Sequence, residues 1–506
     1  MGQHLSDQPS FSFQASDDYR RLREAFQRAG FRDKDVLAAL GISEIGAIRG
    51  SDRGILLRRT RGGTPLETLI RLFLIEVPVD IAAAQQAIHP VKVESLVDAG
   101  LVGVEGSSVA TAVKLVPFGD LFFAFDRLDR LRAGCADYVM GMGSSSITLA
   151  NITIRRQGVA TLDLGTGCGF QALLAASHSK QVVAVDRNPR AISLASFNAR
   201  INGLDNVACL EGDLFEPVEG RTFDLVVSNP PFVISPGQRY IYRDSGIRGD
   251  EICRKIFREV PRFLREGGYC QMICNWVEKR GEDWRETLRP WFEGIGCDVW
   301  VMRSQTGGAE TYATVWIRGT ELQGDADSAA EFERWMAYYE EQGIEGMGLG
   351  MVTMRRREGA ANWFRAEDGP DKMLGPCGDT VERGFALTDF LMTVPEDAAL
   401  LAMPLQASPD IVLERQYAPS PEGWQELETV VSFRKGLVYS GKIDRFVADL
   451  LTSCDGRRPV GDILSAMASS RDIDKDALIS ESCRIVRQLI ERGFLLPGHV
   501  LDEESP

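Results

Sequence analysis

The stretch "TLDLGTGCGF", residues 161–170, decides the fold. Its first residues end an apolar, β-branched run, glycines follow at alternate positions, and a helical pattern begins at Phe170. Glycines at such a junction let the backbone turn tightly and let a ligand come close to it. A dinucleotide fingerprint, G-x-G-x-x-G, would need its third glycine at the position of Phe170. The stretch therefore predicts a ligand site at the end of a strand, but not a dinucleotide site.

Strands and helices alternate around this stretch, from about residue 126 to residue 320. The strand-like runs are "GVATLDL", "QVVAVD", "NVACLEGD", "FDLVVSNPP", "GGYCQMICNW", "CDVWVM" and "TYATVWI". Strands that alternate with helices of about 10 to 15 residues predict an α/β fold with a doubly wound, mostly parallel sheet. Ligands bind such sheets at the carboxyl ends of the strands. Residues at those ends are therefore candidates for the site.

Acidic side chains follow the first strands. Asp163 ends the first strand, Asp186 ends "QVVAVD", and Asp213 follows the third strand in "EGDLF". With its D-x-G-x-G-x-G spacing, the chain here resembles the class I S-adenosylmethionine-dependent methyltransferases, over about residues 160–320. An acidic residue after the second strand can accept hydrogen bonds from both ribose hydroxyls of a nucleoside. The resemblance implies S-adenosylmethionine as the cofactor, with Asp213 facing the adenine amino group.

The resemblance also implies a Rossmann-like, seven-stranded methyltransferase sheet and a set of cofactor-binding residues. That set is Asp163, Gly165, Thr166, Gly167, Gly169, Asp186, Arg187, Asp213, Leu214 and Asn229. The 4 histidines and 10 cysteines lack the spacing of metal ligands, so we expect no metal site and no histidine-based triad.

The segment "SNPPFV", residues 228–233, directly follows the apolar run "FDLVV". Proline cannot donate to a sheet ladder, so the pair of prolines ends the strand and stiffens the loop. The Asn229 side-chain oxygen and the Pro230 carbonyl can then accept hydrogen bonds from a planar nitrogen and aim its lone pair at a methyl group. Phe232 can stack on the planar group. We therefore expect Asn229, Pro230 and Phe232 to be the catalytic residues.

The motif [NDS]-P-P-[FYW] is typical of methyltransferases that act on adenine or guanine amino groups and on glutamine amides. The "EP" turn at 216–217 and Val233 make this segment most similar to release-factor glutamine methyltransferases, although those usually have tyrosine where this chain has Phe232. The leading hypothesis is N-methylation of a protein glutamine. An exocyclic amino group of RNA or DNA and a non-catalytic, cofactor-binding regulatory protein remain open. The arginines that could guide a nucleic acid are Arg49, Arg53, Arg58, Arg59 and Arg61.

Two further segments belong near the cofactor by their position in the chain. Residues 138–146, in "ADYVMGMGSSS", predict either a lid over the cofactor or an interdomain linker. The loop "GQRYIYRDSGIRGDEI", residues 237–252, follows the NPPF motif on the carboxyl side of the sheet and is placed to contact a polar substrate. The candidate substrate contacts are Pro231, Arg239, Tyr242 and Arg243, with Tyr240 and Arg248 nearby.

We expect four domains along the chain. They are a helical and winged-helix-like adaptor (1–125), the methyltransferase domain (126–320), an α+β accessory region (321–437) and a small winged-helix-like domain (438–506). The helix expected over 91–99 carries Lys92 against Glu94 and Asp98, which suits protein contact better than phosphate contact.

Composition limits the partners of the chain. The 506 residues are 44% hydrophobic and carry a formal net charge of -15, which argues against electrostatic coating of a nucleic acid. We find no signal peptide and no apolar run long enough to cross a bilayer, so we expect a cytoplasmic protein without a membrane partner. A macromolecular or peptide substrate is favoured over a nucleic acid, and no pattern indicates an oligomeric state.

Overall fold

The computed structural model describes residues 10–43, 52–237, 239–244, 249–320, 325–359, 361–471 and 475–498. It divides into two compact units. The first comprises Met1–Ala150 and Arg156–Asp368, and the second comprises Asn151–Arg155 and Gly369–Pro506. Each unit has its own buried core.

The first unit is built on an eight-stranded sheet with the order β13-β11-β12-β10-β9-β6-β7-β8. The strands are β6 (Val159–Leu164), β7 (Ser179–Asp186), β8 (Val207–Glu211), β9 (Phe223–Ser228), β10 (Leu264–Glu278), β11 (Cys297–Gly308), β12 (Gly346–Arg356) and β13 (Phe364–Asp368). The ladders from β8 to β10 are parallel, whereas β12 runs antiparallel to β10 and β11. Strand order reverses between β6 and β9, which is where ligands bind such sheets.

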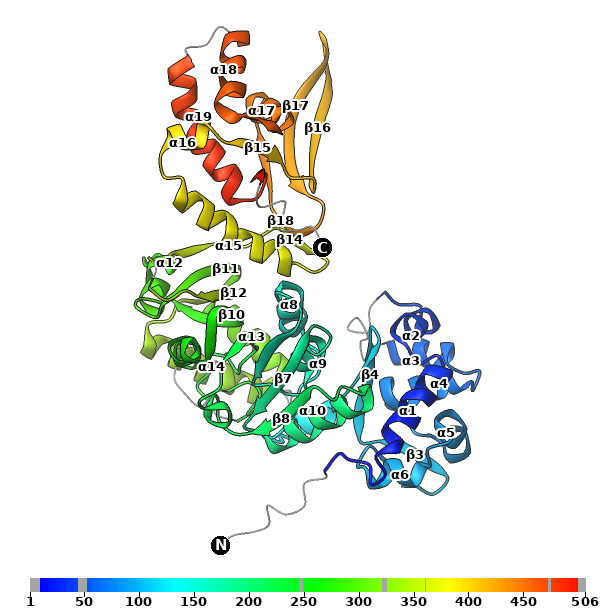
Figure 1. The fold of residues 1–506 in the computed structure, drawn as a ribbon. Coiled ribbons are helices and arrows are strands. Elements are labelled where there is room, and N and C mark those ends of the chain that lie inside the picture. The colour runs from blue at the N-terminus through cyan, green and yellow to red at the C-terminus, as the bar shows by residue number, and fades with distance from the viewer. Residues whose placement is uncertain are drawn as a thin grey trace. The chain divides into compact units, whose positions relative to one another are not determined.

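Helices α9 (Phe170–Ala175) and α10 (Pro189–Asn202) follow β6 and β7 and pack on this sheet. The chain also forms α8 (Ser144–Ile152) before β6, α11 (Glu251–Glu259) between β9 and β10, and α12 (Trp284–Leu288) between β10 and β11. Figure 1 shows α10 running beside β7 and β8, which it contacts. The doubly wound α/β prediction is confirmed. Six of the seven predicted strands are present as β6 to β11, and β12 and β13 complete the eight-stranded sheet.

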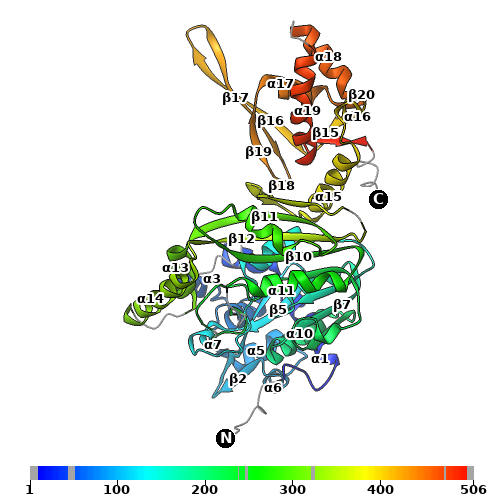
Figure 2. The ribbon, with the colours of Figure 1, turned by 90° about the vertical axis from the view of Figure 1, so that its left-hand side faces the viewer.

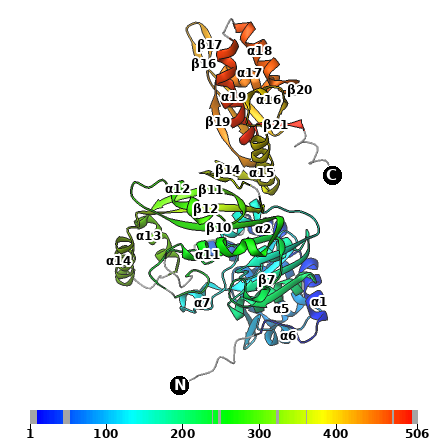
Figure 3. The same cartoon turned by 60° about the vertical axis from the view of Figure 1, so that its left-hand side comes forward.

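One predicted strand is wrong. Residues 311–317, "TYATVWI", lie inside helix α13 (Ala309–Thr320), which pairs with α14 (Asp325–Gln342). Figures 2 and 3 show these two helices side by side. The buried residues of α13 are Ala309, Ala313 and Ile317, whose spacing of four is that of a helix face. The antiparallel strand of the sheet is β12 instead, so the sheet continues beyond residue 320, where we expected it to end.

The N-terminal part of the first unit contains helices followed by hairpins. The helices are α1 (Asp17–Arg28), α2 (Asp33–Leu40), α3 (Arg53–Arg59), α4 (Pro65–Leu69), η3 (Ile70–Leu74), α5 (Ile81–Ile88), α6 (Val93–Asp98) and α7 (Leu128–Arg132). The strands are β1 (Val79–Asp80), β2 (Val102–Glu105), β3 (Ser108–Thr111), β4 (Val113–Phe118) and β5 (Leu121–Asp126). The helices and hairpin expected of a winged helix are present, and the winged-helix assignment itself stays a prediction.

Helix α10 joins this N-terminal part to the sheet. Its Asn198 and Asn202 side chains each accept from a backbone N–H and donate to a backbone C=O of β5. The aromatic rings of Phe13 and Tyr19 pack against Phe197 on the same helix. These contacts place the N-terminal helices and the sheet in one continuous core.

The second unit combines small sheets with five helices among its described residues. The helices are α15 (Gly378–Thr393), α16 (Asp397–Leu401), α17 (Arg445–Ser453), α18 (Val460–Arg471) and α19 (Lys475–Glu491). The strands are β14 (Lys372–Leu374), β15 (Pro404–Ala407), β16 (Ile411–Ser420), β17 (Gly423–Phe433), β18 (Gly436–Val438), β19 (Ser440–Ile443), β20 (Asp455–Pro459) and β21 (Leu495–Pro497). The stretch "APSPEGWQ", residues 418–425, forms the hairpin turn between β16 and β17.

Candidate active site

A cavity lies at the carboxyl ends of β6, β7, β8 and β9, where the strand order reverses. Residues from all four strand ends line it. The predicted site residues in its wall are Asp163, Gly165, Thr166, Gly167, Asp186, Arg187, Asp213, Leu214, Asn229, Pro231 and Tyr242. The structure thus brings together residues from four separate places in the sequence.

The glycine turn after β6 has a left-handed backbone at each glycine. The φ angles are 74° at Gly165, 57° at Gly167 and 86° at Gly169, a region that L side chains avoid. A Cβ atom at Gly167 would meet no atom within 4 Å, whereas one at Gly169 would lie 3.2 Å from Ala195 Cβ. Gly167 therefore keeps the cavity open. Gly169 lies outside the cavity wall and allows the turn to pack closely against α10.

Asp163 accepts hydrogen bonds from the glycine turn and from α9. It is 1% exposed, and its Oδ2 accepts from Thr166 Oγ1 at 2.5 Å and from the Ala172 N–H at 2.9 Å. Burial raises the pKa of Asp163 to about 7, against the smaller, opposing effect of these hydrogen bonds. The carboxyl group therefore joins the turn to α9, and its ionisation occurs near neutral pH.

Asp186 joins the turn to the next helix. Its Oδ2 accepts from the Gly167 N–H at 2.8 Å, and its Oδ1 accepts from the Asn188 N–H at 2.9 Å. Desolvation raises the pKa of Asp186 above its ordinary value, although these backbone hydrogen bonds lower it. Because each carboxylate oxygen has a second lone pair, both can still accept a hydroxyl from a ligand. This arrangement fits the expected contact with the two ribose hydroxyls.

The end of β8 completes the cofactor side of the cavity. Leu214 has a φ of 45°, which is unusual for a residue other than glycine. Strained backbone of this kind is concentrated at functional sites. The Gly212 N–H donates to Asp186 O at 3.1 Å, so the strained segment is tied to the end of β7. Asp213 is exposed between them and faces the cavity.

Asn229 stands at the first position after β9. Its Nδ2 donates to Ser145 Oγ and Ser146 Oγ, both at 3.1 Å. Its Oδ1 is buried, and no donor among the described residues hydrogen-bonds to it. A buried, unsatisfied acceptor costs about 1–3 kcal/mol. Asn229 also lines the cavity, so its unsatisfied oxygen is a candidate acceptor for a ligand that binds there.

Pro230, Phe232 and Arg239 also lie outside the cavity wall. Pro230 and Phe232 are buried, and Phe232 is 9% exposed. Stacking of Phe232 on a substrate therefore stays a prediction. Arg239 is exposed, with its guanidinium over the Tyr240 ring. Arg248 lies outside the described residues.

Arg243 does not have the surface position expected of a substrate contact. It is 1% exposed and forms an ion pair with Asp244, with Nε 2.8 Å from Oδ1. Asp244 also accepts from the backbone N–H groups of Arg239 and Tyr240. A charged pair that is buried in this way must be hydrogen-bonded to be tolerated. The pair therefore shapes the loop after the NPPF motif from inside.

Helices α13 and α14 also contact the loop that follows the NPPF motif. Tyr312 of α13 accepts from the Ile234 N–H at 3.2 Å and from Asn275 Nδ2 at 2.6 Å. Tyr339 of α14 donates to Ile234 O at 2.8 Å. Sequence reasoning missed these contacts because we expected a strand in place of α13 and placed α14 in an accessory region.

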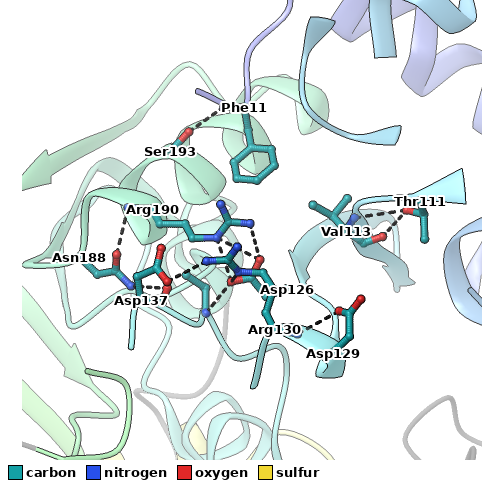
Figure 4. A network of polar contacts seen from close by, with 11 residues as sticks. Phe11, Thr111, Val113, Asp126, Asp129, Arg130, Asp137, Asn188, Arg190 and Ser193 are labelled. Carbon is teal, nitrogen blue, oxygen red and sulfur yellow. Dashed lines mark hydrogen bonds and ion pairs between the residues drawn. The ribbon is translucent and has the colours of Figure 1, made fainter. Parts of the chain in front are cut away.

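Residues 138–141, 143, 145 and 146 line the cavity, so the lid interpretation fits the structure. Asp126 forms a buried ion pair with Arg190 at 2.6 Å, which Figure 4 shows. Asp126 also accepts from the Val139 N–H at 2.8 Å and so anchors this segment. Asn188 Nδ2 donates to Asp137 O at 2.9 Å. Asn188 also caps α10 through its contact with the Arg190 N–H. The Asn-Pro pair at 188–189 was a usable helix-start signal, whereas nothing in the sequence pointed to Asp126.

The cavity suits a nucleoside cofactor by its own geometry. It combines an open glycine turn, a carboxylate with free lone pairs and a partly apolar wall that includes Phe170 and Ile252. Among the residues that the structure describes, no cluster of three or more His, Cys, Asp or Glu side chains could hold a metal ion. In the same part of the chain, no helix is both long enough and apolar enough to span a bilayer.

Known proteins match the segment that forms this cavity. A family model described as a methyltransferase domain matches residues 155–314, and two models of domains of unknown function match residues 28–112 and 382–497. A protein N5-glutamine methyltransferase of Methanocaldococcus jannaschii is 33% identical over 135 residues, 25% of this chain and 68% of the relative.

Two other relatives are covered less completely. A release factor glutamine methyltransferase of Xylella fastidiosa is 36% identical over 126 residues, 22% of this chain and 46% of the relative. A ribosomal RNA small subunit methyltransferase C of Alcanivorax borkumensis is 33% identical over 114 residues, 22% of this chain and 31% of the relative. The chain thus spans less than half the length of these two relatives. The match to the M. jannaschii protein covers more than two thirds of that relative, and it shows that this chain belongs to the class I S-adenosylmethionine-dependent methyltransferases.

Proposed function

We propose that this chain transfers a methyl group from S-adenosylmethionine to the side-chain amide nitrogen of a glutamine in a protein. The observation that carries the proposal is the buried Asn229 Oδ1, an acceptor without a donor among the described residues, on a residue that lines the cavity. A primary amide presents the N–H groups that this oxygen needs. Two of the relatives above are named as glutamine methyltransferases, which supports an amide as the target.

The cofactor would be held by the glycine turn and by the acids at the strand ends. Asp186 would accept from the ribose hydroxyls, Asp213 would face the adenine, and the open face of Gly167 would allow close approach. When bound, S-adenosylmethionine supplies an electrophilic methyl group, whose bond to sulfur breaks, leaving its electron pair on sulfur, as the new nitrogen–carbon bond forms.

The residues of the NPPF motif would prepare the nitrogen. Asn229 Oδ1 and the Pro230 carbonyl would accept its two N–H groups and so turn its lone pair away from the planar amide. Positioning of this kind lowers the barrier because the reacting atoms are already aligned. The prolines fix both acceptors in space, and the nitrogen loses one proton to water after transfer.

An amino group of RNA is the second candidate. It would use the same acceptors, and one relative is named as a ribosomal RNA methyltransferase. Arg53, Arg58 and Arg61 are exposed on and just after α3. Their contribution competes with the strongly acidic net charge of the chain. We further propose that the flanking domains present a macromolecular substrate and that the protein works in the cytoplasm.

The experiment offers both classes of acceptor at once. Purified chain is incubated with tritium-labelled S-adenosylmethionine and an extract from cells that lack the enzyme. One portion of the labelled product is then digested with protease and another with ribonuclease. We expect the label to be released by protease alone. Asn229→Ala should abolish labelling while cofactor affinity stays within about 3-fold, because the lost oxygen contacts the acceptor. Label released by ribonuclease, or a fully active Asn229→Ala variant, would contradict the proposal.

A further inference from the structure

Two serines at the start of α8 hold the nitrogen end of the Asn229 amide. Asn229 Nδ2 donates to Ser145 Oγ and to Ser146 Oγ, both at 3.1 Å. A primary amide nitrogen has two N–H groups, so these contacts satisfy both. Both serines line the cavity. The nitrogen end of the side chain therefore faces α8.

The nitrogen and the oxygen of the Asn229 amide need different hydrogen-bond partners. With the nitrogen toward α8, one buried acceptor, Oδ1, is left for a ligand. If the amide were rotated by 180°, its oxygen would face the serine hydroxyls and two N–H donors would be left unsatisfied in the same buried place. Each unsatisfied polar group costs free energy, so the serines favour the first orientation. In the rotated orientation, the N–H groups of Asn229 would face the substrate nitrogen, which itself carries N–H groups and needs a hydrogen-bond acceptor.

The position of the serines is itself fixed. Gln171, which is 7% exposed, donates from Nε2 to Ser146 O at 2.7 Å. Gln171 lies in the first turn of α9, directly after the glycine turn. This bond ties the start of α8 to the element that forms the cofactor side of the cavity. The start of α8 therefore contacts both the Asn229 amide and the helix that follows the glycine turn.

We infer that Ser145 and Ser146 are positioning residues that fix the Asn229 amide with its oxygen toward the methyl acceptor. The inference rests on the proposed function, because it concerns the same acceptor site. The serines act through Asn229: they saturate its nitrogen and thereby determine which atom the substrate meets. The structure thus gives the segment 138–146 a part in acceptor orientation in addition to its place beside the cofactor.

The test compares maximal rates of protein labelling at saturating S-adenosylmethionine, with the cell extract as acceptor. Wild-type chain must first label protein, and a failure there concerns the proposed function rather than this inference. The double variant Ser145→Ala/Ser146→Ala should lower the maximal rate by about 10- to 100-fold. The dissociation constant for S-adenosylmethionine should stay within about 3-fold, and the melting temperature within a few degrees.

Matched variants separate orientation from general damage. Ser144→Ala, at the exposed first residue of the same helix, should keep the wild-type rate. Threonine at positions 145 and 146 keeps both hydroxyls and should keep most of the rate. In an Asn229→Asp background the side chain has oxygen at both ends, so removing the serines should cost less than about 3-fold. An unchanged rate for the double alanine variant, or an equal loss in both backgrounds, would overturn the inference.

Discussion

Asp163→Asn should make the ligand-free protein more stable at alkaline pH. Burial raises the pKa of Asp163 from its ordinary 3.8 to about 7. The folded state therefore favours the protonated form of Asp163. This preference stabilises the folded protein fully below about pH 4, and the stabilisation is lost as the pH rises through 7. Asparagine keeps an oxygen that can accept from Thr166 and Ala172, but it carries no charge to desolvate.

The size of the effect follows from the same two pKa values. A displacement of the pKa from 3.8 to about 7 corresponds to roughly 4 kcal/mol when the group is fully ionised, of which about 3 kcal/mol falls between pH 5 and pH 8.5. For a unit of this size, that is a change of about 3 to 5 °C in the difference between the two melting temperatures.

The assay is thermal unfolding of wild-type and Asp163→Asn protein without cofactor, at a series of pH values. The melting temperature of the variant should rise relative to that of the wild type as the pH increases. Asp120→Asn, at the exposed turn between β4 and β5, controls for the loss of one carboxylate charge. A difference in melting temperature between wild type and Asp163→Asn that stays constant from pH 5 to pH 8.5 would refute the reasoning. The pKa of the buried carboxyl would then not be raised.

Three other substitutions test the site. Asp186→Ala should weaken S-adenosylmethionine binding by roughly 30-fold, since hydrogen bonds to a carboxylate contribute about 2 kcal/mol; calorimetry with Asp205→Ala as the control checks it, and unchanged affinity would remove Asp186 from the site. Gly169→Ala should lower the melting temperature more than Gly158→Ala, because both residues have positive φ but only Gly169 faces close neighbours; equal losses would contradict this. Asp244→Ala should cost roughly 3 kcal/mol by leaving the buried Arg243 charge without its carboxylate, and adding Arg243→Met should recover part of the loss in denaturant unfolding; a further loss on adding Arg243→Met would contradict the role of the ion pair.

The parts of the site that the sequence predicted are those encoded locally. A glycine turn, an acid at a strand end and an Asn-Pro-Pro segment each occupy a few consecutive residues, and the parallel sheet then brings the strand ends together. This is why Asp163, Asp186, Asp213 and Asn229 could be placed in one cavity before the structure was considered.

The parts that the sequence did not predict depend on contacts between distant residues. Asp126 and Arg190 lie far apart in the chain, so no local pattern joins them. Residues 311–317 are rich in β-branched and aromatic side chains, which favours a strand, whereas the buried residues Ala309, Ala313 and Ile317 have the helical spacing of four. Arg243 was expected at the surface because a charged residue in a loop usually is, but its partner Asp244 allows burial.

The central claim is that Asn229 presents an oxygen to a glutamine amide beside the methyl donor. The most direct test is the chemical identity of the methylated group in protein labelled by the purified chain. An N-methylated glutamine amide releases labelled methylamine on acid hydrolysis, and fragment masses locate the methyl group on a glutamine side chain. The account predicts both results, and it predicts that Asn229→Ala yields neither. Label recovered on a carboxylate ester, on a lysine or on an RNA base would contradict it.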